Sequence, residues 1–247
     1  QPQLAGLGDQ LQRRTEQIDR YRRFTQLAGP ALTTAAHGFQ MRFSARDVNK
    51  LCLDALNTFD VLDDPDWHNR LVEGPFTDVQ RETVKDQVVE LLIVAAMQIA
   101  LRDSGDEAGL ARTEHALQLL DQAADLRDPS LAIWALRWRF HRRLGNDAQA
   151  ERAMTEMQNT PMQTANDYYL MGSITLNILK DPQSARQLYL QAVKRVPNHY
   201  GAHFGLFLCA SEVETLGSRP QQLVHLTTCL VQNPDPDLFY FRGMMNF

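Results

Sequence analysis

Residues 182–197 read PQSARQLYLQAVKRVP, and this stretch sets the pattern of the second half of the chain. Ala185, Tyr189 and Ala192 stand four and then three residues apart, and Pro197 follows five residues later. Similar spacings recur about 35 residues to either side, in Ala150, Met154 and Met157, and in Gln222, Leu226, Cys229 and Pro234. A period of this length is typical of a helical solenoid, in which each unit buries its apolar face against its neighbours. The period therefore predicts a surface that binds other proteins.

Amphipathic patterns of helical period fill most of the chain, and strand signals are scarce. The Gly29-Pro30 pair is expected to end the first helix, because proline lacks a backbone donor and its ring clashes with the preceding turn. Residues 63–67 and 103–106 are predicted turns. The predicted helices cover residues 4–27, 31–41, 45–59, 79–101, 107–126, 130–144, 148–157, 166–179, 183–196, 200–216, 220–231 and 237–247.

The fold class expected from these patterns is all-α. A polar N-terminal helix occupies residues 1–29, and a helical region over 30–106 leads into an α-solenoid of helix pairs over 107–247. The last repeat is truncated, since Tyr240 and Gly243 repeat Tyr169 and Gly172 at an offset of 71 residues and the pattern stops at Phe247. The sequence is therefore expected to be a piece of a longer protein.

Charge and composition favour an ordinary globular chain. With 25 basic and 30 acidic residues the net charge is −5, so no nucleic-acid partner is predicted. No apolar run reaches the roughly 18 residues of a membrane helix, and no targeting segment is present. The cytoplasm is the default expectation, and an extracytoplasmic location stays open if a membrane segment lies upstream. The three cysteines are predicted to be buried thiols, with a Cys209–Cys229 disulfide left open.

Catalytic motifs are absent from the sequence. It contains no glycine-rich phosphate loop, HExxH or GxSxG string, so neither enzyme activity nor a cofactor is predicted. His199 and His203 have the spacing of a zinc pair, but a turn position for one and a packed position for the other is the favoured interpretation. Asp63, Asp64 and Asp66 lack the glycine and distal glutamate of a calcium loop, and turn and cap roles are expected for them.

The repeated residues resemble tetratricopeptide repeats. That family has a bulky residue and a small residue four apart on the first helix, an Ala-x3-aromatic-x2-Ala second helix and a closing proline. The best-fitting unit is Tyr169, Ser173, Ala185, Tyr189, Ala192 and Pro197. The units on either side depart from the pattern, since Trp138 is far too large for the small position and Gln222 replaces an alanine.

A second resemblance extends into the first half of the chain. The strings VLDDPDW at 61–67, VKDQVVELL at 84–92, DYYLMG at 167–172 and YFRG at 240–243 carry it. Together they resemble the C-terminal helical region of planctomycete-type serine/threonine protein kinases that contain tetratricopeptide repeats. The resemblance implies a non-catalytic recruitment or regulatory region, with the kinase domain outside this sequence. A free-standing adaptor that self-associates through its uncapped ends is the alternative.

The arginines of residues 137–143 suggest where a partner binds. Trp134, Trp138 and His141 share the face assigned to packing, and Arg139 and Arg142 share the neighbouring face, with Arg143 beside them. In tetratricopeptide repeats that neighbouring face lines the concave groove. The same register adds Leu170, Ile174, Asn177, Phe207 and Phe241. A groove that grades from basic to apolar suits a protein or peptide with acidic and hydrophobic residues. Ordinary solvated arginines are one alternative, and a homodimer is another.

Overall fold

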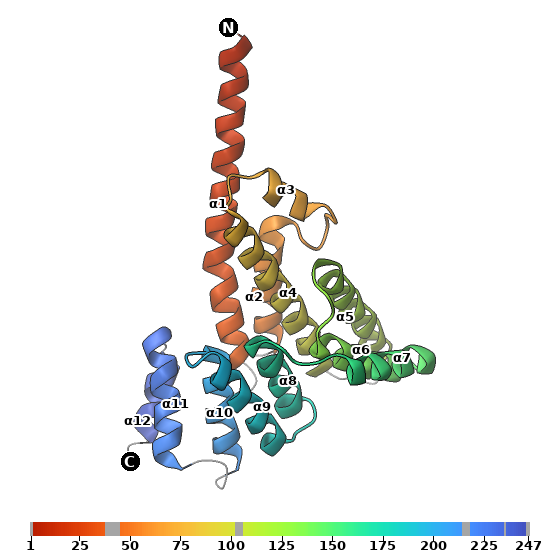
Figure 1. Ribbon diagram of the computed structural model, residues 1–247, viewed down its shortest axis with the longest axis vertical. Helices are drawn as coiled ribbons and strands as arrows, with labels where there is room; N and C mark the ends of the chain where they lie inside the picture. The colour runs from red at the N-terminus through yellow and green to blue at the C-terminus, as the bar shows by residue number, and fades with distance from the viewer. Residues whose placement is uncertain (1, 38–44, 102–105, 214–217, 235, 246–247) are drawn as a thin grey trace. The chain divides into compact units, whose positions relative to one another are not determined.

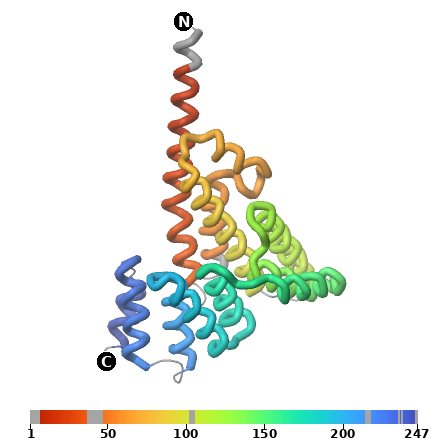
Figure 2. The backbone as a smooth tube through the Cα atoms, in the orientation of Figure 1, coloured from red at the N-terminus to blue at the C-terminus, as the bar shows by residue number. Residues whose placement is uncertain are grey.

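The computed structural model describes residues 2–37, 45–101, 106–213, 218–234 and 236–245 (Figures 1 and 2). These residues form helices joined by turns, with no strand among them, and the predicted all-α class is confirmed. They divide into two compact units. Unit 1 consists of Gln1–Gln98 and Gln118–Asp128, and unit 2 consists of Ile99–Leu117 and Pro129–Phe247.

Unit 1 begins with one long helix, α1 (Pro2–His37), which runs through Gly29-Pro30 without a break. The predicted stop at this pair is therefore wrong, and the helix predicted over 31–41 continues α1 as far as the described residues go. Pro30 lies on the exposed side, while Ala28 and Ala31 beside it are fully buried. Burial of these alanines holds the turn helical although proline has no N–H to donate, since packing outweighs local propensity.

The remaining helices of unit 1 are α2 (Ala45–Leu56), the 3-10 turn η1 (Asn57–Phe59), α3 (Trp67–Glu73), most of α4 (Asp78–Leu101) and the C-terminal part of α5 (Glu107–Leu126). α1 packs along α2 and η1. Thr77 caps α4, because its Oγ1 accepts from Gln80 N at 3.2 Å and its N–H donates to Gln80 Oε1 at 2.9 Å. Of these helices, only α3 was not predicted. Trp67, which was expected in a turn, is the first residue of α3 and is buried.

Unit 2 is built from consecutive helix pairs. They are α6 (Leu131–Arg143) with α7 (Asp147–Asn159), α8 (Ala165–Asn177) with α9 (Pro182–Arg195), and α10 (Tyr200–Glu212) with α11 (Arg219–Gln232), followed by α12 (Pro236–Met244). Each pair packs together, and α9 and α8 also pack against α10. The predicted helices lie close to these bounds. Side chains at Ser130, Thr164 and Asp181 accept from backbone N–H groups and fix where α6, α8 and α9 begin.

Tyrosine rings seated on glycines join α8, α9 and α10. The Tyr189 ring covers Gly172 and Gly205, and a Cβ at Gly172 would lie 2.7 Å from a carbon of that ring. The Tyr169 ring covers Gly201 in the same way. Tyr189 is 1% exposed, and its hydroxyl donates to Ser173 Oγ at 3.4 Å. Glycine is required at these positions because the rings occupy the space of a side chain.

The predicted packing register holds in two of the three pairs. Ala185, Tyr189 and Ala192 are buried, as are Gln222, Leu226 and Cys229. In α7 the prediction fails beyond Ala150, because Met154 is 37% exposed and Met157 is half-buried. Ala153 is buried instead, so α7 packs through two small side chains spaced by one turn.

Candidate partner-binding surfaces

The three arginines of the predicted groove lie on α6. Arg142 is exposed, and Arg139 and Arg143 are half-buried. Arg142 Nη1 lies 3.6 Å from Asp147 Oδ1 at the start of α7, and both side chains are mostly exposed, so the pair adds little stability. The Arg137 guanidinium lies over the Trp134 ring, 4.9 Å from its centroid. α6 therefore combines guanidinium groups with indole rings.

A pocket of ≈ 640 Å³ lies between α6 and α7. It is larger than a pocket of about 490 Å³ in unit 1, and both volumes are in the range of small-ligand sites. The larger pocket contains Arg142 together with Trp138, and it is lined by Trp138, Arg142, Asp147, Ala150, Glu151, Met154 and Thr155. Trp138 occupies the position in α6 that Ser173 occupies in α8. Trp138 lines the pocket and is half-buried, and the wall of the pocket mixes aromatic, basic and acidic groups.

The other predicted groove residues are not open to solvent. Leu170, Ile174, Asn177 and Phe207 are between 2% and 5% exposed. α8 and α10 are apolar around most of their circumference, and Gly201 to Ala210 are all buried, as expected of core helices. Phe241 is half-buried and packs edge-on against Phe207, with ring centroids 6.1 Å apart. A partner therefore reaches the α6 arginines more readily than these positions.

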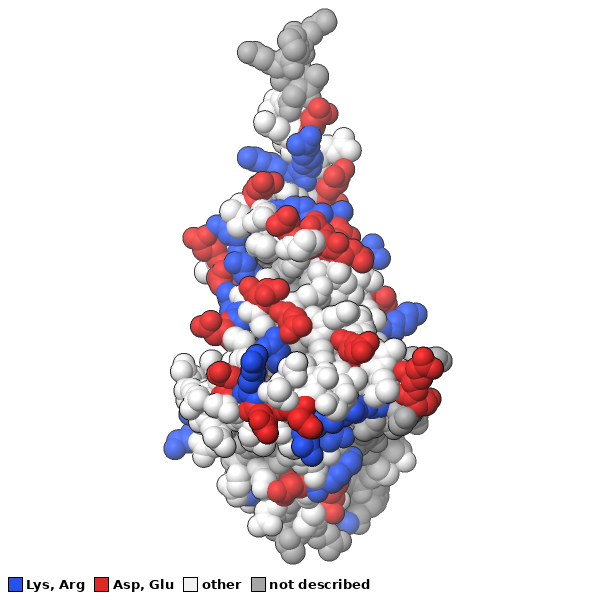
Figure 3. All heavy atoms as spheres, turned by 90° about the vertical axis from the view of Figure 1, so that its right-hand side faces the viewer, with Lys and Arg blue, Asp and Glu red and all other residues white. Residues whose placement is uncertain are grey.

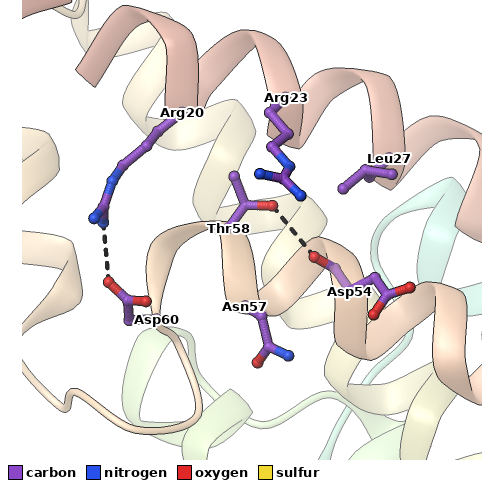
Figure 4. A pocket seen from close by; sticks show the side chains of 7 residues that line it. All are labelled: Arg20, Arg23, Leu27, Asp54, Asn57, Thr58 and Asp60. Atoms are coloured by element: carbon purple, nitrogen blue, oxygen red, sulfur yellow. Dashed lines mark hydrogen bonds and ion pairs between the residues drawn. The ribbon is translucent and has the colours of Figure 1, made fainter. Parts of the chain in front are cut away.

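Unit 1 contains a second pocket, of ≈ 490 Å³, between α1 and the α2–η1 corner (Figure 4). Arg20 Nη1 bonds Asp60 Oδ2 at 2.9 Å, and Thr58 Oγ1 donates to the Asp54 backbone carbonyl at 3.3 Å. Arg23 points into the same space and has no hydrogen bond or ion pair within the described part of the chain. No sequence pattern indicates this pocket, because its residues come from helices more than 25 positions apart.

The aspartates weighed as a calcium loop serve the turn before α3. Arg70 Nη2 lies 2.9 Å from Asp64 and 3.4 Å from Asp60, and also donates to the Phe59 carbonyl at 2.9 Å. Asp64 Oδ1 accepts from Asp66 N at 2.9 Å. The carboxylates are thus paired with a guanidinium and with backbone donors, and the predicted turn role is confirmed.

The histidines follow the favoured interpretation, with one addition. His199 Nδ1 accepts from Ala202 N at 3.2 Å and caps α10, and burial lowers its pKa. His203 is 6% exposed, its Nε2 lies 2.8 Å from the Pro197 carbonyl, and its Nδ1 lies 3.0 Å from Nδ1 of His225 on α11. Among the described residues no three His, Cys, Asp or Glu side chains gather as a metal site would require.

The three cysteines are buried free thiols, as predicted, and Cys209 and Cys229 are not joined. Burial raises the pKa of each to about 12, which keeps the thiols protonated and unreactive.

Within the described ranges, none of the helices combines the length and apolar character needed to cross a membrane. On the face drawn in Figure 3, basic and acidic side chains are interspersed.

No family model matches the chain, and no curated protein is similar enough to match it.

Proposed function

We propose that this chain is a non-catalytic protein–protein interaction module of tetratricopeptide type, an α-solenoid that recruits a protein or peptide. The observation that supports the proposal best is the interlocking of α8, α9 and α10 through Tyr189 on Gly172 and Gly205. The α8–α9 and α10–α11 pairs bury the residues of the repeated spacing, which is how a solenoid is stabilised. Such a stack presents side chains at its surface without assembling a catalytic constellation.

The partner binds at the α6–α7 pocket in this proposal. Trp138 offers a large apolar contact and Arg142 a directional donor, and these two residue types dominate the energetics of protein interfaces. Arg139 and Arg143 add positive charge on the same helix, which favours a partner with acidic and hydrophobic residues. Asp147 and Glu151 in the pocket oppose that preference, so the sign of the partner's charge is the point to test.

The test compares two fluorescent peptides, one alternating acidic with large apolar residues and one alternating basic with the same apolar residues. We expect tighter binding of the acidic peptide, and a loss of about tenfold in affinity for the Arg139→Glu, Arg142→Glu double variant. Arg152→Glu is the matched control, because Arg152 is an exposed arginine of α7 outside the pocket. Equal binding by the double variant, or a preference for the basic peptide, contradicts the basic site.

We further propose that the module is the regulatory or recruitment region of a larger serine/threonine protein kinase. The support is the string resemblance at 61–67, 84–92, 167–172 and 240–243. Sequencing the reading frame on both sides of residues 1–247 tests it. A kinase domain in the same frame is the expected result, whereas a frame bounded near these residues leaves the alternative, a free-standing adaptor that self-associates.

A further inference from the structure

Two histidines link α10 to α11. His203 of α10 is buried, with 6% of its surface exposed, and His225 of α11 is half-buried. Their Nδ1 atoms lie 3.0 Å apart, and the two ring planes are tilted by 47°. His203 Nε2 lies 2.8 Å from the carbonyl oxygen of Pro197, in the turn between α9 and α10. Both ring nitrogens of His203 are therefore engaged, one by the backbone and the other by a second imidazole.

The Pro197 carbonyl decides which nitrogen of His203 carries the hydrogen. A carbonyl oxygen only accepts, so the 2.8 Å contact requires a hydrogen on His203 Nε2. The neutral His203 ring then has a bare Nδ1, which accepts. His225 must supply the hydrogen of the 3.0 Å contact from its own Nδ1. The donors thus run in one direction, from α11 through α10 to the turn after α9.

This arrangement limits the number of protons that the linked rings can hold. His225 Nε2 is the only ring nitrogen of the pair that can take up a further proton while the link is intact. A proton on His203 Nδ1 would set two N–H groups against each other and break the contact. Separated rings can each take up one proton. Because the separated rings bind more protons than the linked rings, acid favours their separation.

The charged groups around the pair act in the same direction. Burial, followed by the effects of His203 and Arg186 of α9, lowers the pKa of His225 to about 4. Burial also lowers the pKa of His199, the N-cap of α10, and His203 adds to that effect. Arg186 and His199 carry positive charge or none, so neither compensates a proton on the pair.

We propose that His203 and His225 form an acid-sensitive link between α10 and α11, closed while the rings share one hydrogen and opened when both rings are protonated. The link joins three consecutive parts of unit 2, namely the turn after α9, α10 and α11. Its opening is local, because the buried Leu226 and Cys229 keep α11 attached to the pair. The link stands whether or not the α6–α7 pocket binds a peptide.

The first test is nitrogen NMR of the imidazole rings in the whole 247-residue chain, from about pH 8 to about pH 4. At the alkaline end we expect the hydrogen of His203 on Nε2, that of His225 on Nδ1, and a scalar coupling between the two Nδ1 nuclei. The coupling should disappear in acid. His115, an exposed histidine of α5, is the control and should show both tautomers in exchange. A hydrogen on Nδ1 of His203 at the alkaline end, or a coupling that persists when both rings are protonated, overturns the proposal.

The variant His225→Gln tests whether acid opens the link. The glutamine amide donates to a neutral His203 ring and, after a flip, accepts from a protonated one, so it keeps the link closed at either pH. At about pH 4.5, the α11 amides of the wild type should exchange hydrogen at least about tenfold faster than those of the variant. Amides of α8 and α9 should exchange equally in the two proteins. Equal exchange in α11 overturns the proposal, as does faster exchange in the wild type that extends equally over α8 and α9.

Discussion

The α6–α7 and α8–α9 pairs have similar length and spacing, yet equivalent side chains of α7 and α9 differ in burial, since Met154 is 37% exposed and Tyr189 is 1% exposed. Both pairs consist of helices of 13 or 14 residues, and Ala150 in one corresponds to Ala185 in the other. α8–α9 closes on Tyr189, whose ring fills the space above Gly172. α6–α7 has Met154 at the place of Tyr189 and Trp138 at the place of Ser173, and a pocket of ≈ 640 Å³ lies there.

The difference shows that a helical period decides which residues face a neighbour, while side-chain volume decides whether the two surfaces meet. The Tyr189 ring fits between the helices because the residue opposite it is a glycine, and the ring fills the space that a side chain would occupy there. The Trp138 ring is not enclosed in this way and remains half-buried at the rim of a cavity. A large aromatic residue on the second helix therefore closes α8–α9, whereas one on the first helix of α6–α7 stays half-buried beside a pocket.

Ala185→Arg should have the largest effect on this comparison. Ala185 is fully buried against α8, and a charge there would have no partner and no room. We expect a loss of about 4 kcal/mol or more in the free energy of unfolding, measured by urea titration of the helical signal. An unchanged urea midpoint would show that α9 does not use the register described above.

Tyr189→Ala should cost nearly as much, about 3–5 kcal/mol, because it empties the space over Gly172 and Gly205. Met154→Ala is the matched change in α7 and should cost about 0.5 kcal/mol, since that side chain is 37% exposed. Tyr189→Phe separates the ring from its hydroxyl and should retain most of the stability, given the long 3.4 Å bond to Ser173. Equal costs at Tyr189 and Met154 would remove the contrast between the two pairs.

Substitution by leucine at the two equivalent alanines should reveal the pocket directly. Ala185→Leu overpacks a closed interface and should cost about 1–3 kcal/mol. Ala150 is also buried but lines the α6–α7 pocket, so Ala150→Leu should cost less than Ala185→Leu, about 1 kcal/mol. Thermal and urea unfolding of both variants measure the difference, and a larger penalty at Ala150 would mean that the α6–α7 pair is closed in solution.

The stability of the α10–α11 pair depends on pH through His225 of α11. Burial, with His203 and Arg186 nearby, lowers the pKa of His225 from its ordinary 6.5 to about 4. The unfolded chain therefore takes up this proton first as the pH falls. The resulting stability is fully present above pH 6.5 and is lost progressively between pH 6.5 and pH 4.

For the half-buried His225 ring this loss is expected to be on the order of 1 kcal/mol, allowing for solvent screening. Urea midpoints of the wild type and of His225→Gln, compared at pH 7 and pH 4, measure it. The variant should show a smaller decrease than the wild type. His199, whose pKa burial also lowers, contributes in the same direction and accounts for part of what remains. Identical decreases in the two proteins would exclude His225 as the source.

Local sequence patterns predicted the helices well, but they did not predict the contacts that each helix makes. The predicted starts of α6, α8 and α9 at residues 130, 166 and 183 lie within one residue of the observed starts, because turn and cap signals act within one turn. Pro30 led to a wrongly predicted helix end, because the burial of its neighbours outweighs the local preference of proline to end a helix. The contact of His203 with His225 joins residues 22 positions apart on different helices, and no spacing pattern indicates it.

The helical character of the chain, the ends of most helices and the inward-facing residues of α9 and α11 follow from local patterns in the amino-acid sequence. These features depend on period, caps and turn residues, all of which act over a few positions. Only the packing of the helices against one another buries Leu170 and Phe207 and forms the pocket between α6 and α7. Those outcomes depend on side-chain volumes brought together from different helices, which periodicity along one helix does not encode.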